Sequence, residues 1–440
     1  MIHNPLNPAR IAACFAMAGI ALCSMSVAAQ AKHAVRPTST VQSWVGSWAS
    51  SQQIPEPRNA LDPADLTDAT LRQIVHLTMG GKELRVHLSN AFGTAPLHIS
   101  AAHIARPLSR STGSIDVSTD RALSFSGSPD VTIPAGAEYV SDPIAYPVAA
   151  FDDLAISLYL EIPPDIQTSH PGSRATSFYV HGNQVSAVDL LNTKQVDHWF
   201  VISGVDVKAP SQAAAVVTLG DSITDGRGST TNGNDRWPDD LARRFQASPT
   251  TRTLSVLNHG VGGGRLLLYG NGPPALARID RDVIAQTGVR YLIVFEGIND
   301  LGTLTADHEA TQADHDALVK RIIGAYEQIV LRAHAHGIKV MGATITPDME
   351  FATYHPTAAN EADRQAVNAW IRAPGHYDAI VDFDKLVRDP ANPDHLSANY
   401  DSGDHIHPSP SAYRAMADAI PLSFFSRGKG RNEHPRPRKH

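Results

Sequence analysis

Cysteine is almost missing from this 440-residue chain, which has only Cys14 and Cys23. Without residues 1–31 no thiol is left, so the remaining chain has neither a disulfide framework nor a cysteine nucleophile. An excess of basic residues is missing too, because the net charge is −7, and this argues against nucleic acid as the main partner. Outside the N-terminal region, no apolar run is long enough to cross a bilayer.

The N-terminal region has the pattern of a cleaved secretory signal peptide, which we expect to cover residues 1–31. Arg10 precedes an apolar run at 11–27 that has no acidic residue, and the Ala-Gln-Ala sequence at 29–31 provides the small side chains that a signal peptidase requires. The pattern therefore predicts a secreted or periplasmic protein with no transmembrane segment in the mature chain. An uncleaved membrane anchor is the alternative interpretation.

Residues 32–210 have the alternating hydrophobic pattern of β-strands, separated by proline and glycine and without a long helical pattern. We expect an N-terminal β-sandwich domain of the jelly-roll type. Apolar alternation over 75–79 and again over 84–88, with Gly80-Gly81 between them, predicts a β-hairpin in this domain.

The pattern changes over residues 211–426, where short apolar runs alternate with helical stretches. This alternation is typical of an α/β domain whose parallel sheet is covered by helices on both faces. Strands are expected at 213–219, 254–258, 291–296, 339–345 and 378–382, and helices near 237–246, 315–336, 360–372 and 410–425. The tail at 427–440 is basic and rich in glycine and proline, which predicts disorder.

A serine stands where the first strand of this α/β domain ends, in Gly220-Asp221-Ser222-Ile223. Open α/β sheets keep their reactive groups beyond the carboxyl ends of the strands. A serine hydroxyl needs a base to take its proton, and His407 is the candidate because Asp404, three residues earlier, could orient its ring. Alone, this Asp-x-x-His pattern is equally typical of a surface histidine.

Two further segments offer hydrogen-bond donors for a developing oxyanion. The glycine-rich loop at 258–264 follows the second expected strand, and Asn299 follows the third. The loop lacks the G-x-G-x-x-G order of a dinucleotide site, which leaves a tight turn as its alternative interpretation. Asn299 could equally cap a helix.

Along the chain, the four segments follow the order of the serine turn at 220–223, the glycine loop at 258–264, Asn299 and the segment from Asp404 to His407. In this order they resemble the SGNH hydrolase superfamily, also called GDSL esterases, over about residues 211–425. The resemblance implies a three-layer α/β/α fold in which Ser222 is the nucleophile, His407 the base and Asp404 the residue that orients it. It also implies an oxyanion hole made by Ser222, Gly263 and Asn299. Neither a metal nor another cofactor is expected, although His405 and His407 beside Asp404 could be interpreted as a metal site. For Asp225 and Arg227 we expect turn chemistry rather than a place in the pocket.

The front half also resembles a known domain. Leu71-Arg72-Gln73 and the sequence at 88–93 are similar to a β-domain that precedes the hydrolase in a bacterial secreted branch of the superfamily. Two roles compete for such a domain: it binds carbohydrate or shapes the substrate cleft, or it only stabilises the protein.

The sequence therefore predicts a secreted serine esterase that hydrolyses carboxylic esters, with short acyl groups, acetyl above all, on carbohydrate as the expected substrates. Small-molecule and polysaccharide esters both remain open as partners. A lipase or aryl-esterase acting on lipid or small aromatic esters is the first alternative. The second is a glycan-binding protein on a hydrolase scaffold.

Overall fold

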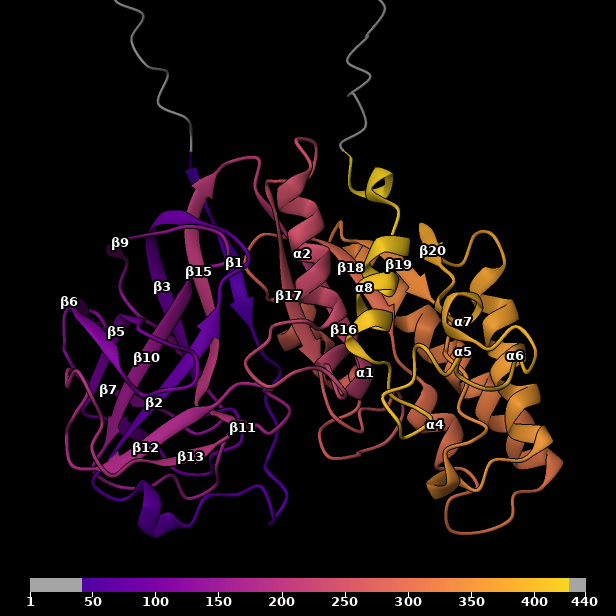
Figure 1. The fold of residues 1–440 in the computed structure, drawn as a ribbon, viewed down its shortest axis with the longest axis horizontal. Helices are drawn as coiled ribbons and strands as arrows, with labels where there is room; N and C mark the ends of the chain where they lie inside the picture. Colours follow the sequence, from indigo (N-terminus) through magenta and orange to yellow (C-terminus); the bar gives the residue numbers. More distant parts are fainter. Residues whose placement is uncertain (1–41, 427–440) are drawn as a thin grey trace, which may run out of the picture. The chain divides into compact units, whose positions relative to one another are not determined.

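The computed structural model describes residues 42–426. The predicted signal peptide at 1–31 and the predicted disordered tail at 427–440 lie outside the described residues. We refer to the elements from β1 to β15 as the β-domain and to those from β16 to the last helix as the α/β domain (Figure 1).

The β-domain contains two larger antiparallel sheets. The first has the order β1 (Gln42–Ala49), β15 (Ile202–Pro210), β3 (Gly81–Ser89), β8 (Glu138–Val140), with β9 (Ile144–Val148) also on β3. The second has the order β13 (Lys194–Val196), β12 (Ser177–His181), β2 (Ala69–His76), β10 (Asp153–Leu160), β5 (Ala101–Pro107), β6 (Ile115–Ala122). Shorter elements are the strand pairs β4 (Leu97–Ile99) with β7 (Val131–Ile133) and β11 (Ser169–His170) with β14 (Trp199–Phe200), and the helix η1 (Pro63–Leu66).

Both larger sheets turn alternate apolar side chains into the same core, which explains the period of two in the sequence. Leu71 and Val75 of β2 and Leu84 and Val86 of β3 are all buried in it. The antiparallel β-rich domain is thereby confirmed.

The predicted hairpin is wrong. Strand β2 pairs with β10 and β12 in one sheet, whereas β3 pairs with β15, β8 and β9 in the other. The two arms alternate in the same way because they face one core from opposite sheets, and Gly80 lies on the crossing between the sheets rather than in a tight turn.

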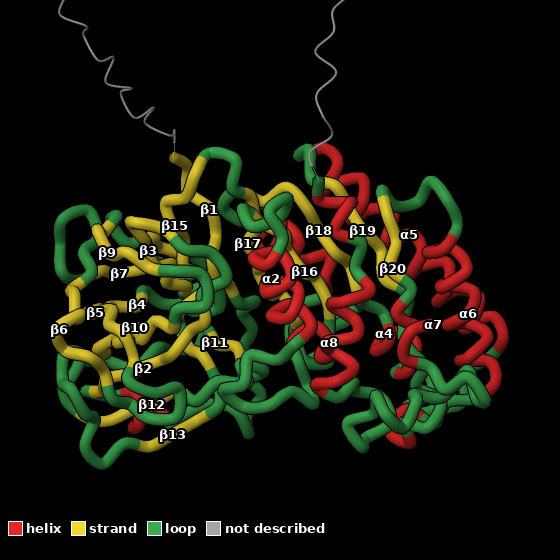
Figure 2. Tube along the Cα trace, turned by 45° about the horizontal axis from the view of Figure 1, so that its top comes forward, coloured by secondary structure: helices red, strands yellow, loops and turns green. Residues whose placement is uncertain are grey.

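The α/β domain has one parallel sheet, as predicted, with the order β17 (Leu254–Gly260), β16 (Ala214–Gly220), β18 (Val289–Phe295), β19 (Lys339–Ala343), β20 (Ala379–Val381). The helices are α1 (Ser222–Asp225), α2 (Trp237–Ala247), α3 (Ala275–Ile279), α4 (Ile298–Gly302), α5 (Gln312–Ala335), α6 (Ala358–Arg372), α7 (Phe383–Val387) and α8 (Pro410–Ala419), with the short turns η2 (Asp280–Ile284), η3 (Ala352–Tyr354) and η4 (Leu422–Phe425). Helices α2 and α8 pack on each other, and α5 packs on α6 (Figure 2). Of the helices between residues 42 and 426, none combines the length and the apolar character that a membrane span needs.

The register of the sheet brings three strand ends to one edge. Gly220 lies beside Gly260 on β17 and beside Phe295 on β18. The loops that follow these strands therefore begin next to one another, which is why sequence blocks far apart along the chain can form one site.

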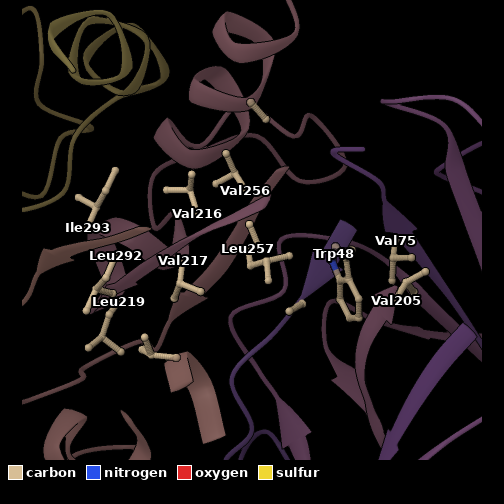
Figure 3. Close-up of a cluster of buried hydrophobic side chains, with 14 of the residues drawn as sticks. Trp48, Val75, Val205, Val216, Val217, Leu219, Val256, Leu257, Leu292 and Ile293 are labelled. Atoms are coloured by element: carbon tan, nitrogen blue, oxygen red, sulfur yellow. The ribbon is translucent and has the colours of Figure 1, made fainter. Parts of the chain in front are cut away.

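The two domains share hydrophobic contacts along β1. Gly46 packs so closely on Leu257 of β17 that a Cβ there would lie 2.8 Å from a leucine methyl carbon. Figure 3 shows Leu257 pointing toward Trp48, and both side chains belong to one continuous buried cluster. Thr78 adds hydrogen bonds of 3.0 and 3.1 Å to the backbone of Val256. These contacts hold strand β1 and the segment after β2 against the α/β domain.

Candidate active site

Ser222 is the first residue of α1, directly after strand β16. Asp221 caps the helix, because its side chain accepts a hydrogen bond of 2.9 Å from the Ile223 backbone N–H. Glycine is required at position 220, since a Cβ there would lie 2.4 Å from the Phe295 carbonyl oxygen. The sharp strand-to-helix turn therefore directs Ser222 to the edge of the sheet, with a backbone N–H that has no acceptor within the helix.

Ser222, His407 and Asp404 form a continuous hydrogen-bonded chain. The Ser222 hydroxyl lies 2.8 Å from Nε2 of His407, and Nδ1 of His407 lies 2.7 Å from Oδ2 of Asp404. The other carboxylate oxygen of Asp404 accepts the His407 backbone N–H at 2.9 Å. Burial favours the protonated carboxyl, but these bonds from His407 outweigh it and hold the pKa of Asp404 well below its usual range. Asp404 is therefore ionised at neutral pH and holds Nδ1, which leaves Nε2 directed at the serine.

Asn299 lies at the start of α4 with its side-chain amide held on both sides. Its Nδ2 donates to the Gly264 carbonyl at 2.8 Å, and its Oδ1 accepts from the Tyr354 hydroxyl at 2.5 Å. An amide nitrogen carries two hydrogens, so one N–H remains for another acceptor. Gly263 adopts φ +67°, a left-handed conformation that favours glycine.

Asp300 fixes the segment that follows the glycine loop. Its carboxylate accepts the backbone N–H groups of Leu266 at 2.8 Å and Leu267 at 3.1 Å. The adjacent residues Asn299 and Asp300 thus bind the same loop from one helix, and this explains why they occur together in the sequence.

Beside the serine, three buried carboxyl groups, Asp221, Glu296 and Asp300, lie close enough to influence one another's charge. Arg278 donates to Glu296 at 3.1 Å and to the Gly220 carbonyl at 3.0 Å. Burial raises the pKa of Asp221 to about 7 and that of Asp300 to about 6, and it raises the pKa of Glu296 well above its ordinary value. Perturbed carboxyl groups that are this close to a reactive side chain are typical of functional sites.

A cavity of about 890 Å³ opens at this edge of the sheet. Ser222, His407, Gly263 and Asn299 all line it. Its other wall belongs to the β-domain, from the loop at 53–59, the loop at 171–174 and His198. The structure therefore brings together the residues that the sequence predicted, with Asp404 reaching the cavity through His407, and it adds a wall from the first half of the chain.

Asp225 and Arg227 also line the cavity, so the expectation of turn chemistry alone is wrong for both. Asp225 lies 2.9 Å from Nε2 of His170, and Nδ1 of His170 lies 2.8 Å from the Ser51 carbonyl. Both partners come from the β-domain and carry no local sequence signal, which is why the pair was missed.

The glycine-loop histidine and the histidine beside the base have other surroundings. His259 is buried, its Nδ1 lies 3.3 Å from the Ser51 hydroxyl, and burial lowers its pKa to about 4. His405 is half exposed, and its Nδ1 lies 2.8 Å from Asp401. Among residues 42–426, no group of three or more histidine, cysteine or acidic side chains is arranged to hold a metal ion.

The parallel sheet, with these residues at its carboxyl edge, places the α/β domain in the class of carboxylic ester hydrolases. Residues 218–415 match the GDSL-like lipase/acylhydrolase family, so the chain carries a domain of that family. A comparison with curated protein sequences finds no match.

Three solved structures illustrate what the α/β domain is similar to. A putative acylhydrolase from Bacteroides fragilis is 21% identical, covers 49% of this chain and 88% of its own, and has a TM-score of 0.36. A GDSL-like lipase from Bacteroides thetaiotaomicron is 21% identical, with 48% and 87% covered and a TM-score of 0.35. An acetylxylan esterase from Geobacillus stearothermophilus, in a catalytic mutant form, is 19% identical, with 49% and 97% covered and a TM-score of 0.36.

Proposed function

We propose that the protein is a serine esterase in which Ser222 is the nucleophile. The proposal is carried by the chain of short contacts from Ser222 through His407 to Asp404 at the edge of the cavity. The serine oxygen attacks the ester carbonyl carbon while its proton passes to Nε2 of His407. His407 then protonates the leaving alcohol, and Asp404 stabilises the imidazolium that forms in between. Water hydrolyses the acyl-enzyme by the same steps in reverse.

The oxyanion of each tetrahedral intermediate binds to three donors in this proposal: the backbone N–H groups of Ser222 and Gly263 and the free N–H of Asn299. Tyr354 and Gly264 support it, because they fix the Asn299 amide before substrate arrives. Donors that are already aimed at the developing charge need no reorganisation during the reaction.

Short acyl groups on carbohydrate are the proposed substrates. The supporting observation is the polar lining of the cavity, to which Gln53, Asn59 and Asn271 contribute amides beside its charged side chains. Such groups match sugar hydroxyls in hydrogen-bonding capacity. Secretion or periplasmic export, which rests on the sequence of residues 1–31, is part of the same proposal because polysaccharide substrates lie outside the cytoplasm.

A lipid or aryl ester is the second candidate, and one feature favours it. Tyr269 lines the cavity with 67% of its surface exposed, and its neighbour Leu268 is 54% exposed. Exposed large apolar side chains at a cavity rim are suited to an aryl group or an acyl chain. Rates on acetyl, butyryl and long-chain para-nitrophenyl esters separate the candidates, since a short-acyl enzyme loses activity as the chain lengthens.

The direct test is Ser222→Ala, with Ser111→Ala in an exposed turn of the β-domain as the matched control. We expect Ser222→Ala to lower turnover of para-nitrophenyl acetate by about 10⁴-fold or more, as loss of a nucleophile does, while the control keeps the wild-type rate. A fluorophosphonate probe should label the wild type and the control but not Ser222→Ala. A wild-type protein that is neither labelled nor active would instead support the glycan-binding alternative.

A further inference from the structure

Arginine is concentrated on the wall of the cavity. Arg58 and Arg174 come from the β-domain and Arg227 and Arg265 from the α/β domain, whereas only Glu56 and Asp225 lining the cavity are acidic. The chain as a whole has a net charge of −7. A cationic cavity in an acidic protein is a local feature that overall composition does not explain.

These four guanidinium groups make no direct hydrogen bond to another side chain among the described residues, although the charge of Arg265 acts on Asp300. None forms an ion pair or a side-chain hydrogen bond there, and the Nε atoms of Arg174 and Arg265 are buried without any acceptor. Arginines in the interior differ, since Arg364 pairs with both Glu361 and Asp384. A buried donor without an acceptor is destabilising, and both residues line the cavity, where a ligand can provide an acceptor to their guanidinium groups.

The two acidic residues of the wall do not pair with these arginines. Asp225 lies 2.9 Å from His170 through one carboxylate oxygen, its other oxygen is buried without a hydrogen-bond partner, and Glu56 accepts a hydrogen bond of 2.7 Å from Asn59. The four arginines are therefore available to a ligand.

Arg174 is held in a costly backbone conformation. Its φ is +49°, in the left-handed region that residues other than glycine rarely adopt. The Asn232 backbone N–H donates to the Arg174 carbonyl at 2.8 Å, and this bond ties the loop to the α/β domain. Conformations of this kind persist at sites where the position of a side chain matters for function.

We propose that the cavity takes esters of a carboxylate-bearing carbohydrate, such as an acetylated uronic acid, and that Arg174 and Arg265 bind the carboxylate. A guanidinium and a carboxylate form paired, charge-assisted hydrogen bonds, and neither of these guanidinium groups bonds to another side chain. One arginine comes from each domain, so the β-domain takes part in substrate selection. This inference rests on the proposed esterase function and narrows its substrate class.

The test compares two substrates that differ in one group: a methyl galacturonoside and a methyl galactoside, each acetylated at the same hydroxyl. We expect kcat/KM to be at least about tenfold higher for the uronate, because hydrogen bonds between charged groups are stronger than neutral ones. The preference should shrink as salt is raised, since salt screens a partly exposed ion pair. Para-nitrophenyl acetate, which has no carboxylate, reports the esterase reaction alone.

Arg174→Gln and Arg265→Gln identify the residues that bind the carboxylate. Each should lower kcat/KM on the uronate by roughly 10-fold or more and change the rate on para-nitrophenyl acetate less than about twofold. The matched control is Arg321→Gln, because Arg321 is exposed on helix α5. It should leave both rates unchanged.

The outcomes distinguish failure of this inference from failure of the proposed esterase function. Equal rates on the two sugars, with para-nitrophenyl acetate still hydrolysed, would overturn the inference and leave the esterase intact. A preference for para-nitrophenyl hemisuccinate over para-nitrophenyl butyrate that Arg174→Gln abolishes would overturn it as well, because the carboxylate would then belong to the acyl group. Failure on para-nitrophenyl acetate itself would remove the proposed function.

Discussion

The carboxyl groups buried beside Ser222 have raised pKa values, whereas those buried in the β-domain have lowered ones. Asp221 and Asp300 reach about 7 and about 6 because burial outweighs their hydrogen bonds. In the β-domain, burial is outweighed instead: His76 and Arg110 lower the pKa of Asp153, and His87 lowers that of Asp206. The same physical cost is therefore compensated for these β-domain carboxylates and, within the α/β domain, for Asp282 beside Arg278 and Arg281, but it is left largely uncompensated for Asp221 and Asp300.

This difference indicates what each region does with its buried charge. A buried carboxylate with a cationic partner is compatible with a stable fold, whereas buried carboxyl groups with raised pKa values, such as Asp221 and Asp300, reduce stability and are typical of functional sites. The β-domain therefore uses its buried charges for structure. Its exposed contribution to the site is the wall that carries Arg58 and Arg174.

The largest expected effect comes from Asp404, the carboxylate at the site that does have a partner. Asp404→Asn should lower kcat on para-nitrophenyl acetate by about 10³- to 10⁴-fold, because His407 loses the group that orients its ring and stabilises its positive charge. Asp316→Asn, on the exposed face of α5, is the matched control and should have the wild-type rate. If Asp404→Asn stayed within tenfold of the wild type, the pairing of Asp404 with His407 would be structural.

A smaller loss is expected at Asn299. Asn299→Ala should lower kcat by about 10²- to 10³-fold with little change in KM, because the removed donor acts on the transition state. Tyr354→Phe should cost about tenfold or less, since it removes only the hydroxyl that fixes the amide. Tyr139→Phe, on an exposed tyrosine of β8, is the control. If Asn299→Ala raised KM by the same factor by which it lowered kcat, the amide would also bind the substrate in its ground state.

The sequence could predict that the candidate catalytic residues share one edge of the sheet, because each follows a strand or precedes a helix. Gly220 ends β16, Gly260 ends β17, and the register of the sheet places them side by side. Ser409 caps α8 two residues after His407, which also gives a local signal. A parallel sheet converts such local patterns into a shared edge, so the order of the blocks along the chain was sufficient.

The cavity wall that the β-domain forms could not be predicted, because it depends on contacts between residues far apart in the chain. His170 lies 55 positions from Asp225, and Tyr354 lies 55 positions from Asn299. The failed hairpin at Gly80-Gly81 has the same cause, since alternation in a sequence identifies the face that is buried but not the strand that pairs with it. The arginines carry no motif, and only their shared cavity distinguishes them from surface residues.

The smallest expected effect is on stability alone. It concerns His87 and tests, in the β-domain, the comparison between the buried charges of the two domains. Burial would lower the pKa of His87, but Asp206 and Glu138, each 3.0 Å from a ring nitrogen, raise it to about 9. Its stabilising contribution is therefore complete below about pH 6.5, the ordinary histidine value, and is lost as the pH rises through 9. The carboxyl groups with raised pKa values, Asp221 and Asp300, affect stability at lower pH, because they destabilise the folded state increasingly between about pH 4 and pH 7.

Urea unfolding at pH 6.5 and pH 9 separates the two windows. The wild type should lose about 2–3 kcal/mol between these values through His87, and His87→Gln should lose much less, with unchanged turnover of para-nitrophenyl acetate at pH 7. His336→Gln, at the exposed end of α5, should behave as the wild type. If His87→Gln kept the full pH dependence, the charges of the β-domain would not be its source of stability, and the contrast between the two domains would fail. If the variant lost turnover as well, the β-domain would affect catalysis from a position outside the cavity wall.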